Sequence, residues 1–238
     1  MRVISLLAVA TCLANSGCNA VKTQTKNAEG VRLYQQGDYQ QAAARFQEAV
    51  AASPDDADGY YNLAASMHKI GALYNRPDDI RQAEGLYNQC LERYPDHTEC
   101  YRGLAVLLSE TQRQDAAFRL LNNWNAASPT NPDPDIELAR LLEETGQSEQ
   151  ATAQLIEALA VDPKNSRAFT ALARLRDQSG NHRQALADYQ KSLELNQFQP
   201  EVVARVASLQ ASLQAAAAAV PNVAAPTRVS QTWRSSVR

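Results

Sequence analysis

Two columns of small residues run through the chain at a nearly constant period. The first column reads Gly30, Ala64, Ala105, Ala139 and Ala173, and the second reads Ala42, Ala83, Ala117, Ala151 and Ala185. Successive members are equally spaced, except for one longer interval in each column, from Ala64 to Ala105 and from Ala42 to Ala83. A fixed period of this kind is the signature of a repeat protein, in which each repeat packs against its neighbours. Such a chain is expected to act through an extended surface and not through a catalytic centre.

Other residue types recur in the same frame and indicate two helices in each repeat. A bulky apolar residue follows each alanine of the second column by four positions: Phe46, Tyr87, Leu121, Leu155 and Tyr189. Proline ends four repeats, at Pro54, Pro95, Pro129 and Pro163. A left-handed turn between two helices favours glycine, which needs no Cβ clearance. The turn positions carry Gly37, Gly71, Gly146 and Gly180, and the third repeat departs from the pattern with Gln112.

These columns resemble those of the tetratricopeptide repeat family. The resemblance implies an all-α fold, a right-handed superhelix (α-solenoid) of five antiparallel helix pairs followed by a C-terminal capping helix. The repeats are expected at residues 23–56, 57–97, 98–131, 132–165 and 166–199, and the capping helix at residues 200–218. The apolar residues at helical spacing in the capping helix are Val203, Val206, Ala207 and Leu213.

The one longer interval in each column places an insertion in the second repeat. Gly37 and Gly71 keep the ordinary repeat spacing, so the insertion falls between Gly71 and Ala83. We expect it to enlarge the turn between the two helices of that repeat. A longer surface loop is tolerated, at about 0.6 kcal/mol per doubling of its length. The alternative is a recognition loop that carries Tyr74 and Arg76.

The first residues have the pattern of a bacterial export signal. Within residues 1–17, the positively charged Arg2 is followed by an apolar segment. This segment is too short to span a bilayer as a stable helix. The residues Ser16 and Gly17 before Cys18 are similar to the lipobox of bacterial lipoproteins, although Asn15 stands where leucine is usual. The resemblance implies that Cys18 is acylated and becomes the mature N-terminus, with a short tether at residues 18–22.

Three locations follow from this N-terminal segment. The lipobox resemblance implies an outer-membrane or periplasm-facing lipoprotein, because Asn19 follows the cysteine in place of the aspartate associated with inner-membrane retention. Ordinary signal cleavage after Ser16 or Ala20 would instead give a soluble periplasmic or extracellular protein. A cytosolic location is the third alternative.

The charge of the chain argues against nucleic acid as a partner. The formal net charge is −3, and setting aside Arg2 and the tail arginines Arg228, Arg234 and Arg238 leaves −7 for residues 18–218. An acidic body repels phosphate backbones. The basic tail at residues 219–238 carries Trp233 and is expected to be disordered, either as a passive terminus or as a tether to an anionic surface.

The sequence predicts no enzyme, no cofactor and no metal site. The common motifs of hydrolases, metalloproteases, dinucleotide-binding and phosphate-binding proteins do not occur in it. Cys90, His97 and Cys100 cluster at one turn between repeats, but they supply at most three ligands at unusual spacing.

Cys90 and Cys100 are instead a candidate disulfide. They lie five residues before and five after Pro95, on two helices that run antiparallel from that turn. An exported protein meets oxidising conditions in which the bond could form. The alternative is two small buried residues, because Cys90 occupies a column where other repeats have Ala49 and Ala158.

Partner binding is expected on the concave face, which the resemblance assigns to the first helix of each pair. The candidate residues are Asn27, Tyr34, Tyr61, Asn62, His68, Lys69, Arg102, Arg140, Arg167 and Arg174. Arginine pairs bidentately with carboxylates, so an extended peptide with acidic side chains and an aromatic or apolar anchor is the expected complement. The alternative is that these charges serve solubility. A family activity that holds a peptide C-terminal carboxylate is not expected, because Asn27 and Asn62 have no lysine partner.

The combined prediction is a non-enzymatic scaffold for protein–protein interaction in the bacterial cell envelope, anchored by lipid and binding peptides or partner proteins on its concave face. A soluble exported adaptor is the first alternative, and a regulatory subunit of an envelope enzyme is the second. Architecture of this kind does not identify the partner.

Overall fold

The computed structural model describes residues 25–218, and every regular element in that range is an α-helix. The predicted signal peptide, Cys18, the tether and the tail lie outside these residues. The described residues fall into two compact units on either side of the Pro163–Lys164 bond. Between residues 25 and 218 there is no helix that combines the length and the apolar character needed to cross a membrane.

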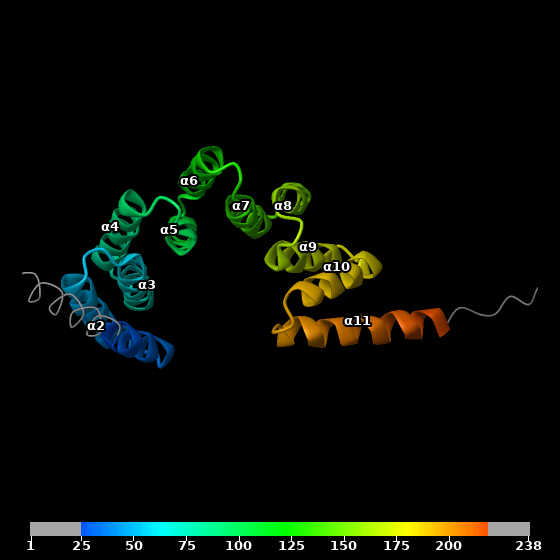
Figure 1. Cartoon of the computed structure of the whole chain (residues 1–238), viewed down its shortest axis with the longest axis horizontal. Coiled ribbons are helices and arrows are strands. Elements are labelled where there is room, and N and C mark those ends of the chain that lie inside the picture. Colours follow the sequence, from blue (N-terminus) through cyan, green and yellow to red (C-terminus); the bar gives the residue numbers. More distant parts are fainter. Residues whose placement is uncertain (1–24, 219–238) are drawn as a thin grey trace, which may run out of the picture. The chain divides into compact units, whose positions relative to one another are not determined.

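The first unit consists of four helix pairs (Figure 1). Its first helix covers residues 25–35. The others are α2 (Tyr39–Ala52), α3 (Ala57–Tyr74), α4 (Pro77–Arg93), α5 (Thr98–Glu110), α6 (Gln114–Ala127), α7 (Asp133–Glu144) and α8 (Ser148–Val161). The second unit contains α9 (Ser166–Gln178), α10 (His182–Leu195) and α11 (Pro200–Ala218). The predicted all-α repeat fold, with five helix pairs and a capping helix, is therefore confirmed.

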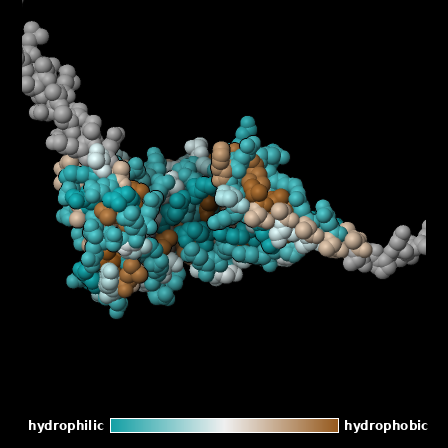
Figure 2. Space-filling view, turned by 90° about the horizontal axis from the view of Figure 1, so that it is seen from below, coloured by the Kyte–Doolittle hydropathy of each residue, from teal (hydrophilic) through white to brown (hydrophobic). Residues whose placement is uncertain are grey.

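The repeated columns form the core of the helix pairs. All five alanines of the second column are fully buried, and no residue of the bulky column is more than 6% exposed. A Cβ atom on Gly30 would lie 2.5 Å from Cε1 of Phe46, so this position of the first column requires glycine. With the apolar faces turned inward, hydrophilic residues cover most of the surface in Figure 2, and hydrophobic patches are scattered among them.

The turns within the pairs use a left-handed residue, as predicted. Gly37, Gly146 and Gly180 have φ values of 85°, 79° and 80°. Gln112, which breaks the glycine pattern of the sequence, takes the same conformation with φ at 60°. A side chain in this region costs about 1 kcal/mol or more, so the repeat geometry overrides the preference of that residue. Gly71 differs, because it lies inside α3, where a Cβ atom would meet the Ile80 side chain at 2.6 Å.

The expectation of an enlarged turn in the second repeat is wrong. The insertion lengthens the helices instead: α3 has 18 residues and α4 has 17, whereas α5 to α10 have 12 to 14. Asn75 ends α3 in the left-handed conformation, and Pro77 begins α4. Arg76 between them pairs with Asp79 at 2.7 Å. The proposed recognition loop is thus a tight turn of two residues, with Tyr74 exposed at the end of α3.

The capping helix α11 buries part of the predicted stripe: Val206 and Leu213 are half-buried, whereas Val203 and Ala207 are exposed. Val202 and Leu209 are buried against α9 and α10, whereas Val203 is 49% exposed. The guanidinium of Arg205 binds both carboxylate oxygens of Asp177, at 2.5 and 2.7 Å, and ties α11 to α9. The buried stripe therefore contains Val202 and Leu209 in place of Val203 and Ala207, a difference that a spacing argument alone does not resolve.

Candidate partner-binding face

Most of the predicted binding residues lie on the first helix of each pair in the first unit. We call the surface formed by residues 25–35, α3, α5 and α7 the inner face. It carries Asn27, Tyr34, Tyr61, Asn62, His68, Lys69, Arg102 and Arg140. Arg167 and Arg174 are exposed on α9 in the second unit. The structure therefore brings together the residues of the first unit, and these divide into two regions.

The first region is neutral and consists of Asn27, Tyr34, Tyr61 and Asn62, and we call it the tyrosine region. The side-chain amide of Asn62 donates a hydrogen bond to Asn27 Oδ1 at 3.1 Å. Burial, reinforced by the neighbouring Tyr61, raises the pKa of Tyr34 to about 12. Burial also raises the pKa of Tyr61. Both phenols are only partly buried and stay protonated at neutral pH, so they offer an aromatic surface and hydrogen-bond donors.

The tyrosine region rests on buried aromatic residues. The ring of Tyr61 lies 6.3 Å from that of Tyr87 and 6.0 Å from that of His97. Tyr87 is 2% exposed and packs so close to α5 that a Cβ atom on Gly103 would lie 2.5 Å from its ring. The partly exposed ring of Tyr61 is thereby held on a rigid support, and preorganised groups bind at a lower entropic cost.

His68 lies between the two regions and is held by a carboxylate. Its side chain is buried, and Nε2 lies 3.0 Å from a carboxylate oxygen of Glu110 on α5. Burial lowers the pKa of His68, and the attraction of Glu110 opposes this shift without cancelling it. The adjacent Lys69 is exposed. His68 is therefore a neutral residue that joins α3 to α5, and Lys69 is the exposed cation of this part of the face.

The second region consists of Arg102, Glu137, Arg140 and Glu144, and we call it the arginine region. Arg102 Nε donates to one oxygen of Glu137 at 2.7 Å, and Arg140 Nε donates to the other at 3.1 Å. Arg140 also pairs with Glu144. Glu137 is only 1% exposed. Burial opposes the charge of Arg102, but the attraction and the hydrogen bond of Glu137, together with the attraction of Glu99 and Tyr61, raise the pKa of Arg102.

This pairing changes what the arginines can offer a partner. Both guanidinium groups are engaged by a carboxylate of the chain itself, so an acidic peptide would have to compete with Glu137. The role of Arg102 and Arg140 in binding stays a prediction. Glu137, the buried carboxylate that organises the region, was not singled out from the sequence.

A simple rule of spacing could have found these pairs. Asn27 and Asn62 are 35 residues apart, and so are Arg102 and Glu137. His68 and Glu110, which span the insertion, are 42 residues apart. Each of these spacings exceeds the local repeat interval by a single position. Side chains one position beyond the repeat interval therefore meet across neighbouring first helices.

The cysteine and histidine cluster lies at the turn between α4 and α5. Cys90 and Cys100 are fully buried, with their sulfur atoms paired as a disulfide and their Cα atoms 6.6 Å apart. His97 Nδ1 accepts a hydrogen bond from the Cys100 backbone N–H and so caps α5. The ligand atoms of all three lie within 4.8 Å of one another. Formation of the bond in the cell stays a prediction, and an intact disulfide would leave no thiolate to bind a metal.

Comparison with known families agrees with this repeat geometry. Three family models described as tetratricopeptide repeat match residues 77–132, 115–175 and 166–199, and a model described as TPR repeat matches residues 30–71. The chain belongs to the tetratricopeptide repeat family. Tetratricopeptide repeat proteins typically mediate protein–protein or peptide interactions and are generally not enzymes. The search of curated proteins found no match.

Several solved tetratricopeptide repeat structures are similar to the chain. A thermophilic TPR protein of Thermus thermophilus is 25% identical with a TM-score of 0.59, and the match covers 79% of this chain and 99% of that one. MamA of Desulfovibrio magneticus is 18% identical with a TM-score of 0.45, covering 75% and 97%. YrrB, described as a TPR protein with an unusual peptide-binding site, is 15% identical with a TM-score of 0.42, covering 75% and 88%.

Proposed function

We propose that the chain is a non-enzymatic scaffold that binds a partner protein through the inner face of its first unit, with the tyrosine region as the primary contact. The observation that carries this proposal is the contrast between the regions. The charges of Arg102 and Arg140 are bound by Glu137, whereas Tyr34 and Tyr61 are neutral and partly exposed, and Tyr61 is supported by the buried ring of Tyr87. Aromatic residues of this kind are enriched among the residues that dominate binding energy.

The chemistry of the region defines the partner. An extended segment with an aromatic or apolar anchor would pack on Tyr34 and Tyr61, and its backbone would pair with the amides of Asn27 and Asn62. An acidic side chain of the segment would meet Lys69, which is exposed on the same helix as Tyr61. Such an interaction between exposed charges contributes only about 0–1 kcal/mol, so the anchor sets the affinity.

Site-specific photo-crosslinking in the native host tests this assignment. A benzoylphenylalanine residue replaces Tyr34 or Tyr61 on the inner face, or Tyr74 as a matched control, since Tyr74 is 58% exposed at the end of α3. We expect the same crosslinked partner from Tyr34 and Tyr61 and none from Tyr74. Crosslinks from Tyr74 alone would overturn the assignment to the inner face.

Export and lipid anchoring are part of the proposal and rest on the sequence. The support is the apolar segment followed by Ser16, Gly17 and Cys18. Intact mass of the membrane-extracted protein is expected to show an acylated Cys18 as its first residue. Cys18→Ser is expected to release the protein from membranes, because the acyl chains on Cys18 are the proposed anchor. An unmodified N-terminus at Gly17 or Val21 would instead establish the soluble exported adaptor.

A further inference from the structure

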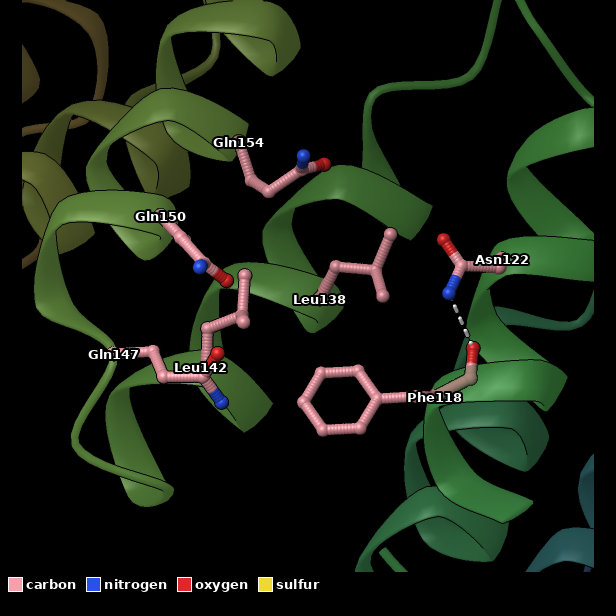
Figure 3. A pocket seen from close by; sticks show the side chains of 7 residues that line it. All are labelled: Phe118, Asn122, Leu138, Leu142, Gln147, Gln150 and Gln154. Atoms are coloured by element: carbon pink, nitrogen blue, oxygen red, sulfur yellow. Dashed lines mark hydrogen bonds between the residues drawn. The ribbon is translucent and has the colours of Figure 1, made fainter. Parts of the chain in front are cut away.

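A second surface of the first unit has the features of a binding site. Between α6 and α8, over α7, lies a groove of about 340 Å³ (Figure 3). We call it the outer groove, and its lining residues are Phe118, Asn122, Leu138, Leu142, Gln147, Gln150 and Gln154. In Figure 3 the ring of Phe118 reaches from α6 toward the leucines of α7, and the three glutamines project from the α8 side. This surface is formed mainly by second helices, and it contains no residue of the tyrosine region or the arginine region.

The equivalent position one repeat earlier carries an ion pair. Phe118 lies one repeat period after Glu84, and Gln147 lies one repeat period after Arg113. Those two earlier residues form a bidentate ion pair that bridges α4 and the start of α6, with nitrogen–oxygen distances of 3.0 and 2.8 Å. In the outer groove an aromatic ring and a neutral amide replace the two charges. At this junction the outer groove therefore lies where the preceding junction has a bridging ion pair.

The lining defines the chemistry of a ligand. Leu138 and Leu142 are buried and form an apolar floor with Phe118, which is partly buried. None of the seven lining residues is ionisable, so the groove offers no counter-charge to a charged ligand. The amides of Gln150 and Gln154 offer donors and an acceptor, as a peptide backbone requires, whereas Gln147 Nε2 already donates one hydrogen bond to Thr145 Oγ1 at 2.9 Å.

The spacing of the glutamines matches an extended chain. Gln147 to Gln154 spans seven residues, which at 1.5 Å per helical residue is about 10 Å. Three residues of extended peptide cover the same length, at about 3.3 Å each. A single bulky side chain from the middle of such a segment would fill the space over the floor.

We propose that the outer groove binds an uncharged, extended peptide segment of a partner protein, which inserts one leucine, phenylalanine or tryptophan side chain against Phe118, Leu138 and Leu142. The glutamines of α8 hold the peptide backbone. This site is independent of the inner face, so the scaffold has two surfaces on which partners can be held at the same time. A neutral glycan is the competing ligand, but the apolar floor favours a hydrocarbon side chain over a hydroxylated ring.

The ion pair of Glu84 and Arg113 suggests a variant in which the outer groove is closed. Phe118→Glu combined with Gln147→Arg copies Glu84 and Arg113 and is expected to close the groove. Peptides are selected from a random phage-displayed library on the full chain, and their affinities are measured for the wild type, the closed variant and Tyr61→Ala. We expect uncharged peptides with one bulky apolar residue, bound about tenfold or more weakly by the closed variant, as exclusion of a buried anchor requires. Tyr61→Ala is expected to bind them unchanged.

Several outcomes would overturn the proposal. One is that every enriched peptide whose binding survives Tyr61→Ala also binds the closed variant as well as the wild type, and another is the absence of any enriched peptide. Binding on a glycan array that the closed variant loses, without peptide binding, would assign the groove to the competing ligand. Circular dichroism and thermal unfolding establish that the closed variant is folded. If it is not, Gln150→Ala with Gln154→Ala removes two amides of the rim and is expected to weaken the same peptides.

Discussion

The two regions of the inner face use the same positions of the repeat for opposite purposes. In the tyrosine region the residues that meet across neighbouring helices are Asn27 and Asn62, which form a single neutral hydrogen bond. In the arginine region they are Arg102 and Glu137, which form a buried ion pair that also holds Arg140. On this face the charged residues therefore hold neighbouring repeats together, whereas the neutral, partly exposed residues are available to a partner.

The largest expected effect comes from breaking the arginine region. Glu137→Ala leaves Arg102 and Arg140 without their shared carboxylate and is expected to lower the free energy of unfolding by about 3 kcal/mol. This is the lower part of the range for buried pairs, because both guanidinium groups keep some contact with water. Chemical denaturation monitored by circular dichroism measures the change.

Glu144→Ala is the matched control for this variant. Glu144 also pairs with Arg140, but its side chain is 46% exposed. Its removal is expected to cost no more than about 0.5 kcal/mol, as for other exposed pairs. Equal effects of the two substitutions would contradict the view that the buried carboxylate organises the region.

The next effect tests the disulfide that links α4 and α5. Cys100 lies two residues before Arg102, and Cys90 lies three residues after Tyr87, which supports Tyr61. A disulfide that closes a loop of this length stabilises a protein by about 3 kcal/mol in the chain-entropy model. Reduction is therefore expected to lower the free energy of unfolding by nearly that amount. Rapid labelling of both thiols in the native, unreduced protein would rule the bond out.

A smaller effect is expected from the support of the tyrosine region. Gly103→Ala places a methyl group 2.5 Å from the Tyr87 ring, and the buried ring has to shift. The expected loss of stability is about 1–3 kcal/mol, as for other overpacked cores. Binding of the inner-face partner is expected to weaken as well, because Tyr61 rests on Tyr87.

Gly85→Ala, in α4, is expected to have the opposite effect on stability. Nothing lies within 4 Å of a Cβ atom at Gly85, which is inside α4. This substitution is expected to raise stability by up to about 1 kcal/mol, because alanine is the better helix former. Destabilisation by both changes would show that the effect at Gly103 does not come from its contact with Tyr87.

The sequence predicted the parts of this fold that depend on residue type at a fixed period. Buried alanines and bulky residues recur because each repeat solves the same packing problem, so Ala117 and Leu121 could be placed from their columns. Gln112 shows a limit, because it adopts a left-handed turn that its own preference disfavours. The insertion shows another, because its length did not reveal that Asn75 and Pro77 end one helix and start the next.

The candidate site was less predictable, because its properties depend on pairs of residues. Considered alone, Arg102 was predicted to bind an acidic peptide. Its spacing to Glu137 indicates instead that its partner lies within the chain. In the sequence, the outer groove is likewise indicated only by comparing Phe118 with Glu84 one repeat earlier. Repeat chains are therefore best interpreted by comparing equivalent positions across neighbours, in addition to the columns themselves.

The smallest expected effect concerns His68, which joins the two regions. Because burial lowers its pKa below the ordinary value of 6.5, the unfolded chain binds more protons than the folded one just below that pH. The contribution of His68 to stability is thus fully present above pH 6.5 and is lost as the pH falls toward its folded pKa. Glu110 opposes the shift, while Lys69 adds to it and Tyr87 faces the ring edge-on.

Thermal unfolding measured between pH 7.5 and pH 5 tests whether stability falls on acidification. The melting temperature of the wild type is expected to fall on acidification by more than that of His68→Gln, which keeps a polar side chain near Glu110 but cannot titrate in this range. Titration of the His68 ring by NMR reports the folded pKa directly and separates it from the exposed His182. A His68 pKa above 6.5, with a wild type that gains stability relative to the variant on acidification, would mean that attraction to Glu110 outweighs burial. The junction between the regions would then be an ion pair, and the inner face would be charged further toward its tyrosine end than the structure indicates.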